Sequence, residues 1–246
     1  MEAPERMATV LGELQLESPA AAVCRDSGGL ALLDVSGSRM IRLDGELHPL
    51  DTVPISARLR ALRGCAADGY YFYVYDNNDL YRMARRDDTL AVWLGNVRVV
   101  GLASFAVGEV LTSDEDHGFI LYKSVFGSSR RFISAADMPR PGALAALPRG
   151  QFCGLSGAGK LAFFNRLGLV EKWSSIPEGT DLLAADDSGA IYLGQRGRPI
   201  FWKLWEGRME PFALPEQTRP VALVALADRL VILDSSTRLL AVACRQ

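Results

Sequence analysis

The densest run of side chains that could do chemistry in this sequence is Asp114-Glu115-Asp116-His117. A related polar run, Asp76-Asn77-Asn78-Asp79, stands earlier in the chain. Carboxylate and amide oxygens are the ligands that hard cations such as calcium take, so the two runs together could hold a metal ion. Asp and Asn are also favoured in tight turns, where their side chains bond to the local backbone. The residue types therefore leave two alternatives open, a binding site and a solvated acidic rim.

A glycine-rich segment further along has part of a nucleotide-binding motif. Gly154-Leu-Ser-Gly-Ala-Gly159-Lys160 carries the glycines and the lysine of a P-loop. A P-loop also needs Ser or Thr after the lysine to reach magnesium, and a helix whose N-terminal amides surround the phosphates. Leu161 follows here, and the residues after it read as a strand. The sequence predicts a hairpin turn at this place and no nucleotide site.

Nucleophilic catalysis by serine lacks its partners in the sequence. The chain has two histidines, His48 and His117, which fall in different repeats. A serine nucleophile needs a base within hydrogen-bond reach. The nearest approach to a GxSxG elbow, Gly154 to Ala158, lacks the final glycine. We predict no catalytic residue, no metal ligand and no cofactor.

The charge balance and the cysteine spacing narrow the class of protein. Lys and Arg number 27 against 29 Asp and Glu, a formal charge of -2, without the basic excess that nucleic acid phosphates require. No apolar run approaches the roughly 20 residues of a membrane span. Met1 to Arg6 carries two acids and is followed by no run of signal-peptide type. The four cysteines, Cys24, Cys65, Cys153 and Cys244, are widely spaced, so we expect reduced thiols in a soluble, cytoplasmic protein.

A repeat sets the architecture that must position these side chains. One series of turn positions is spaced by 40, 39, 42, 39 and 39 residues: Gly29, Gly69, Gly108, Gly150, Gly189 and Asp228. Between the turns lie short alternating runs rich in β-branched and aromatic residues, for example residues 190–195 and 200–205. Each complete unit supplies four such runs and no helix, which is typical of a repeated four-stranded sheet.

The two ends of the chain complement one another. The last unit supplies three strands and stops at Gln246, where a fourth strand should begin, while residues 8–16 alternate as an outer strand. A ring that takes its last strand from the other terminus leaves no open edge. We therefore predict an all-β fold, one six-bladed β-propeller with four antiparallel strands per blade and the last blade closed by the N-terminal strand. The predicted single domain, 1–246, has blades at about 20–53, 59–95, 98–138, 142–177, 180–215 and 220–246 plus 8–16.

The segment Asp187 to Gly207, DSGAIYLGQRGRPIFWKLWEG, places a DxG turn before an apolar strand. With the repeat, it resembles the six-bladed propellers that include NHL-repeat and SMP-30/gluconolactonase-like proteins. The GH and WD dipeptides of WD40 blades do not recur at the repeat spacing. Resemblance to the lactonase-type propellers implies a metal held around the central channel, and hence a metal-dependent hydrolase or lactonase as the alternative function. The predicted first strands, such as LLAA from Leu182, offer mainly apolar or small residues for such a channel.

The lack of catalytic chemistry in a scaffold that presents many loops on one face favours a non-enzymatic interaction or scaffold module. Loops between the second and third strands combine opposite charges, which favours a polar, salt-sensitive contact with a protein partner. The predicted partner-binding residues come from three of these loops: Asp76, Asp79, Asp114, Glu115, Asp116, His117, Arg196 and Arg198. We expect neither nucleic acid nor a membrane as the partner.

Overall fold

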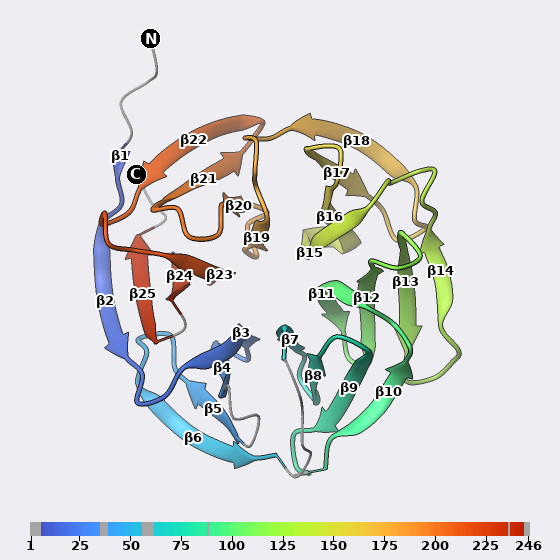
Figure 1. Ribbon diagram of the computed structural model, residues 1–246, viewed down its shortest axis with the longest axis horizontal. Helices are drawn as coiled ribbons and strands as arrows, with labels where there is room; N and C mark the ends of the chain where they lie inside the picture. Colours follow the sequence, from blue (N-terminus) through green and yellow to red (C-terminus); the bar gives the residue numbers. More distant parts are fainter. Residues whose placement is uncertain (1–5, 35–38, 56–61, 88, 236, 244–246) are drawn as a thin grey trace.

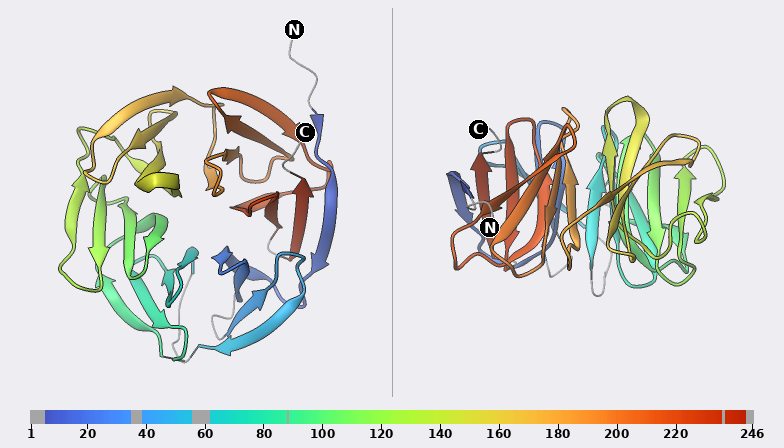
Figure 2. Two further views of the ribbon diagram at one scale, coloured as in Figure 1. Left: turned by 180° about the vertical axis from the view of Figure 1, so that it is seen from behind. Right: turned by 90° about the horizontal axis from the view of Figure 1, so that it is seen from above.

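The computed structural model describes residues 6–34, 39–55, 62–87, 89–235 and 237–243, and their strands form six sheets around a central axis (Figure 1). Each sheet is one blade, with its first strand beside the axis and its fourth strand at the outer edge. In the side view the ring is a disc with loops on both faces (Figure 2). The predicted all-β six-bladed propeller with four antiparallel strands per blade is confirmed. Cys244 lies outside the described residues.

The strands follow one another through the blades in chain order. Blade 1 consists of β3 (Ala20–Asp26), β4 (Gly29–Asp34), β5 (Arg39–Leu43) and β6 (Pro49–Pro54). Blade 2 consists of β7 (Gly64–Ala67), β8 (Tyr71–Tyr75), β9 (Asp79–Ala84) and β10 (Ala91–Gly95). Blade 3 consists of β11 (Val99–Ala106), β12 (Glu109–Asp114), β13 (Phe119–Ser124) and β14 (Arg130–Ile133).

The second half of the ring repeats this arrangement. Blade 4 consists of β15 (Pro141–Leu147), β16 (Gln151–Ser156), β17 (Lys160–Phe164) and β18 (Val170–Ser175), with the short 3-10 turn η1 (Pro148–Gly150) between its first two strands. Blade 5 consists of β19 (Leu182–Ala185), β20 (Ile191–Gly194), β21 (Ile200–Trp205) and β22 (Arg208–Ala213). Blade 6 consists of β23 (Pro220–Ala225), β24 (Arg229–Asp234), β25 (Arg238–Ala243) and β2 (Val10–Gln15). In the part of the chain that is described, no helix is long and apolar enough to cross a membrane.

The ring is closed by the N-terminal strand, as predicted. Strand β2 lies antiparallel to β25, with Leu14 opposite Leu239 and Gln15 opposite Arg238. Leu14 and Leu16 pack against a buried cluster shared by blades 1 and 6. Backbone pairing and apolar contact therefore both hold the closing strand in place, and the edge of β25 is covered.

One strand was not predicted. Strand β1 (Arg6–Met7) lies parallel to β22, with Arg6 opposite Phe212, so blade 5 carries a fifth strand at its outer edge. A strand this short shows no alternation that sequence reasoning can detect. It carries the chain past the rim of blade 5 before β2 enters blade 6 (Figure 1).

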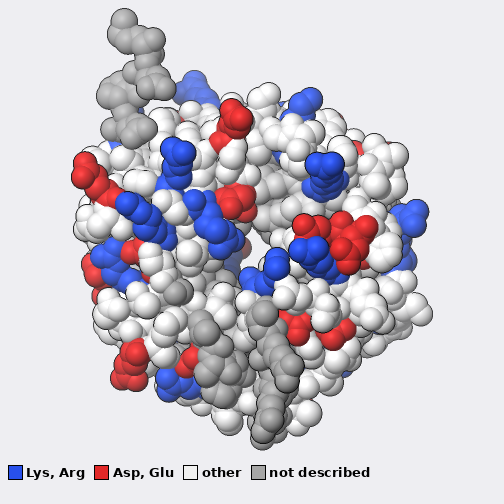
Figure 3. Space-filling view, in the orientation of Figure 1, with Lys and Arg blue, Asp and Glu red and all other residues white. Residues whose placement is uncertain are grey.

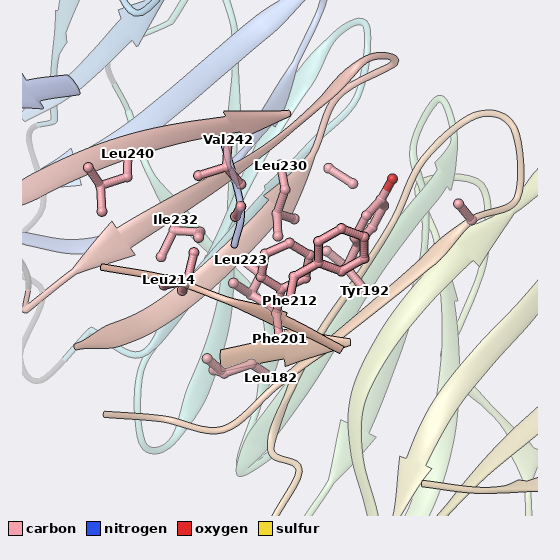
Figure 4. Packing of buried hydrophobic residues seen from close by; sticks show 14 residues of the cluster. Leu182, Tyr192, Phe201, Phe212, Leu214, Leu223, Leu230, Ile232, Leu240 and Val242 are labelled. Carbon is pink, nitrogen blue, oxygen red and sulfur yellow. The ribbon is translucent and has the colours of Figure 1, made fainter. Parts of the chain in front are cut away.

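The hydrophobic core lies between neighbouring blades. Where blades 5 and 6 meet, the rings of Phe201 and Phe212 stack with centroids 5.1 Å apart, beside the fully buried Leu230 and Ile232 (Figure 4). The second strands are buried along nearly their whole length, as in β24, because both faces of a blade pack against neighbours. Such strands read as continuous apolar runs, in contrast to the alternating outer strands.

Aspartates close the turns between first and second strands in two blades. Asp68 in blade 2 accepts a hydrogen bond from the Tyr73 hydroxyl at 2.6 Å, and Asp186 in blade 5 accepts one from the Tyr192 hydroxyl at 3.1 Å. Asp68 also accepts the Gly108 backbone N–H of blade 3 at 2.8 Å. The same device thus recurs in two blades, and in blade 2 it also ties one blade to the next.

Candidate functional site

The two faces of the disc carry different sets of loops. The upper face carries the loops between second and third strands and the connections between blades, and it is the face turned toward the viewer in Figure 3. The lower face carries the turns between first and second and between third and fourth strands. All eight predicted partner-binding residues belong to loops or strand ends of the upper face.

In blade 2, the predicted residues Asp76 and Asp79 shape the loop that joins β8 to β9. Asp76 is buried, and one carboxylate oxygen accepts the backbone N–H groups of Asn78 at 2.8 Å and Asp79 at 3.0 Å. Its other oxygen accepts the Tyr81 hydroxyl at 3.0 Å. Asp79 accepts the Asn96 N–H at 3.1 Å. Asp76 is therefore occupied with the turn, and Asp79 is the more accessible carboxylate of this loop.

In blade 3, the acidic run divides into one buried and several exposed side chains. Asp114 is only 2% exposed and accepts the backbone N–H groups of Asp116 and His117. The Nδ1 atom of His117 lies 2.8 Å from the second Asp114 oxygen. Glu115 pairs with Arg98 at 2.9 Å, and Asp116 lies 3.8 Å from the same guanidinium. The exposed surface here is a mixed-charge cluster of Arg98, Glu115, Asp116 and His117.

In blade 5, Arg196 and Arg198 lie in the loop between β20 and β21. The backbone N–H of Arg196 donates to Asp181 at 2.7 Å, and its Nε atom lies 3.5 Å from the same carboxylate. The Arg198 side chain is exposed and makes no ion pair with any described residue. Blade 4 separates this loop from the blade 3 cluster, so the eight predicted residues form separate groups on one face and not a single site.

Two residues that sequence reasoning missed join Arg196 at the upper mouth of the channel. Arg63 and Tyr75 of blade 2 line the same cavity as Arg196. The Tyr75 ring lies across Gly64, where a Cβ would stand 2.3 Å from the tyrosine hydroxyl oxygen. Burial and then the neighbouring Cys65 raise the pKa of Tyr75 to about 12, although Arg196 and Arg63 act to lower it. The hydroxyl therefore stays protonated, and it lies near two guanidinium groups. We name Arg63, Tyr75 and Arg196 the mouth cluster.

The channel itself is a cavity of about 650 Å³ with walls formed by the six first strands. Its walls are mostly alanine, leucine and valine, as the sequence predicted. Toward the lower face, Arg25 of blade 1 pairs with Asp187 of blade 5 through Nη1 and Oδ1 at 2.6 Å. The volume is in the range of small-molecule sites, and the charged lining residues, among them Arg63, Arg149 and Asp187, come from the loops and strand ends at the two ends of the channel. The space-filling view shows basic side chains beside the opening on the upper face (Figure 3).

A metal-dependent hydrolase, the alternative function, would need a group of side chains that bind the metal ion. Among the described residues, no three His, Cys, Asp or Glu side chains are grouped so that they could hold a metal ion. The carboxylates of Asp76 and Asp114 are instead bonded to their own turns. Cys24, Cys65 and Cys153 are free thiols.

Comparisons with known proteins identify the fold and no family. No protein-family model and no curated protein matches the chain. Virginiamycin B lyase from Staphylococcus aureus has a similar solved structure, with a TM-score of 0.69 and 9% identity over 95% of this chain and 99% of that chain. The structure of YCF48 bound to D1 peptide has a TM-score of 0.64 and 13% identity, over 100% of this chain and 94% of that chain. The WD40 propeller domain of Doa1 has a TM-score of 0.66 and 12% identity, over 98% of each chain. At such identities the similarity establishes the propeller fold alone, and it does not extend to an NHL or SMP-30-like family.

Proposed function

We propose that this chain is a non-enzymatic interaction module whose upper face docks a protein partner around the mouth of the channel. The observation that carries the proposal is the mouth cluster, in which two guanidinium groups and a protonated tyrosine hydroxyl line one opening. Guanidinium groups bind carboxylates through paired hydrogen bonds, and tyrosine adds a further donor. The partner would therefore present a carboxylate to this opening.

The blade 3 cluster supports the same orientation of the partner. Glu115, Asp116 and His117 are exposed on the same face as the mouth cluster, and Arg198 adds a charge on blade 5. Opposite charges spaced around one face give a partner a defined rotational position, and they make the association depend on salt. The similar fold of YCF48 bound to D1 peptide is consistent with a propeller of this size that receives a peptide.

The class of partner and the location belong to the same proposal. A protein partner fits a chain with a formal charge of -2 better than nucleic acid does, because phosphate binding needs a basic excess. We propose the cytoplasm as the location, since three cysteines are free thiols with no pairing among the described residues.

The test is partner capture with matched charge variants. Tagged wild-type protein, a Glu115→Ala/Asp116→Ala variant and an Arg63→Ala/Arg196→Ala variant would each be used to capture proteins from native lysate, with quantitative mass spectrometry. We expect one or more proteins to be enriched by the wild type and lost at least tenfold with the Arg63/Arg196 variant. The purified partner should then bind more weakly as salt increases.

The control is Arg208→Ala, which removes an exposed charge from the outer strand β22 without touching the upper face. It should retain the partner at the wild-type level. A partner retained equally by the wild type and by both upper-face variants would contradict docking at this face.

A further inference from the structure

A second, smaller pocket opens on the lower face between blades 3 and 4. Its volume is about 200 Å³, and its lining comes from both blades: Phe105, Ala106, Glu109, Tyr122, Arg130, Phe132, Phe152 and Arg166. Drug-sized ligands occupy roughly 300–1,000 Å³, so this pocket suits a single side chain better than a whole small molecule. It adjoins the lower end of the channel, because Phe105 and Arg166 line both cavities, and it contains none of the mouth cluster residues.

Four aromatic rings shape the pocket. Phe152 is buried at its base, and Phe105 meets it edge to face with centroids 4.9 Å apart. Phe132 also meets Phe152 edge to face, at 6.2 Å, and Tyr122 lies 6.5 Å from Phe132. Phe105, Tyr122 and Phe132 remain partly exposed. Ring edges and faces therefore border the opening, an arrangement that favours another aromatic ring.

Two arginines, Arg130 and Arg166, border the same pocket. The Arg130 guanidinium carbon lies 4.7 Å from the centroid of the Tyr122 ring, so a wall of the pocket positions this charge. Arg166 packs against Gly150, where a Cβ would lie 1.8 Å from the arginine Nε. Neither arginine forms an ion pair with a described residue, and the Glu109 carboxylate accepts the Tyr122 hydroxyl at 2.8 Å. The rim therefore has an excess of positive charge.

The turns around the pocket expose further apolar side chains. Phe126 in the β13–β14 turn is 90% exposed, and Leu167 in the β17–β18 turn is 79% exposed. Val107, in the β11–β12 turn, is 48% exposed. The β11–β12 and β13–β14 turns are joined by a hydrogen bond from the Val125 N–H to the Gly108 carbonyl. Large apolar side chains gathered on one face are typical of a protein-binding surface.

We propose that this pocket is a docking site for an acidic segment of a partner protein, which inserts one aromatic side chain between blades 3 and 4. Carboxylates that flank the aromatic residue would lie against Arg130 and Arg166. The aromatic walls select the inserted ring, and the unpaired guanidinium groups select the charge around it. Phe126 and Leu167 would cover the rest of the segment.

The test is fluorescence anisotropy with a short fluorescein-labelled peptide that has one central phenylalanine flanked by glutamates. We expect saturable binding, at least tenfold weaker binding when serine replaces the phenylalanine, and none when lysines replace the glutamates. Arg166→Gln should weaken binding about tenfold. Gly150→Asn should do the same, because it displaces the Arg166 side chain while leaving its charge, and asparagine tolerates the positive φ of 70° at this position.

Arg208→Gln, on the outer strand β22 of blade 5, is the matched control and should bind the peptide as the wild type does. Circular dichroism would verify that each variant keeps its strands. Three outcomes would overturn the proposal: no saturable binding at millimolar peptide, equal binding of the lysine-flanked peptide, or unchanged binding by both the Arg166 and Gly150 variants.

Discussion

A substitution of Asp68 tests directly how much the aspartate-closed turn of blade 2, which also bonds to blade 3, contributes to stability. Its carboxylate accepts four hydrogen bonds, from the N–H groups of Tyr70 at 2.7 Å and Tyr71 at 2.8 Å, from the Tyr73 hydroxyl at 2.6 Å and from the Gly108 N–H at 2.8 Å. Hydrogen bonds to charged groups each contribute about 1.5–3 kcal/mol. Asp68→Asn turns one acceptor oxygen into a donor group and opposes about two of these bonds. We expect a loss of about 3 kcal/mol in the free energy of unfolding, and a Tm lower by about 6–12 °C.

Tyr73→Phe removes only the hydroxyl from a fully buried ring and should cost about 1.5 kcal/mol. The double variant should lose less than the sum of the two single losses, by about 1 kcal/mol or more, because both changes break the same bond. Urea denaturation monitored by intrinsic fluorescence measures all three values. Tyr70→Phe is the control, since that side chain is 66% exposed, and it should change stability by less than about 0.5 kcal/mol. Additive losses, or single variants as stable as the control, would refute the reasoning.

Two further predictions concern acid stability and ring closure. Burial raises the pKa of Asp26, but the hydrogen bonds from Arg85 and Arg42 together lower this pKa by more than burial raises it. The folded pKa therefore lies below the unfolded value near 3.9. The stabilisation is then present above about pH 4 and lost as pH falls through the folded pKa, so the stability difference between wild type and Asp26→Asn should narrow on acidification in urea titrations. Removal of residues 1–7 deletes β1 and leaves β2 in place, and it should cost less than about 1 kcal/mol. Removal of residues 1–16 also deletes β2 and exposes the β25 edge, so we expect marked destabilisation and self-association by light scattering; a monomer as stable as the shorter deletion would contradict ring closure.

The fold could be predicted because its information is local and repeated. Turn residues recur at nearly constant spacing, and the second strands are continuous apolar runs between them, so each blade reads in the same way as the next. The closing strand could be predicted because the last repeat has only three strands and the N-terminal region has one strand that belongs to no repeat of its own. Strand β1 could not, since two residues paired in parallel to β22 leave no periodic signal.

The candidate sites depend on information that a single blade does not contain. Asp76 and Glu115 look equally suited to bind a partner in the sequence, yet one carboxylate is bonded to its own turn and the other is exposed. Aspartate serves both roles with the same oxygens, so only the local geometry separates them. At the buried positions Asp76 and Asp114, the need for a turn therefore explains the aspartate better than partner binding does.

Sites that form between blades are harder to predict from sequence patterns. Arg63 and Arg196 come from blades 2 and 5, and Phe105 meets Phe152 across the boundary between blades 3 and 4. In a ring of radial sheets, side chains near the axis or at a blade boundary approach partners from other repeats, so their spacing in the chain carries no motif. The glycines beside Tyr75 and Arg166 leave a local trace of these sites, because each gives the space that a long side chain of the same blade fills. Gly150 has a positive φ in the η1 turn, so the turn alone accounts for that glycine, whereas Gly64 lies in strand β7 without a positive φ and is explained by the Tyr75 ring packed against it.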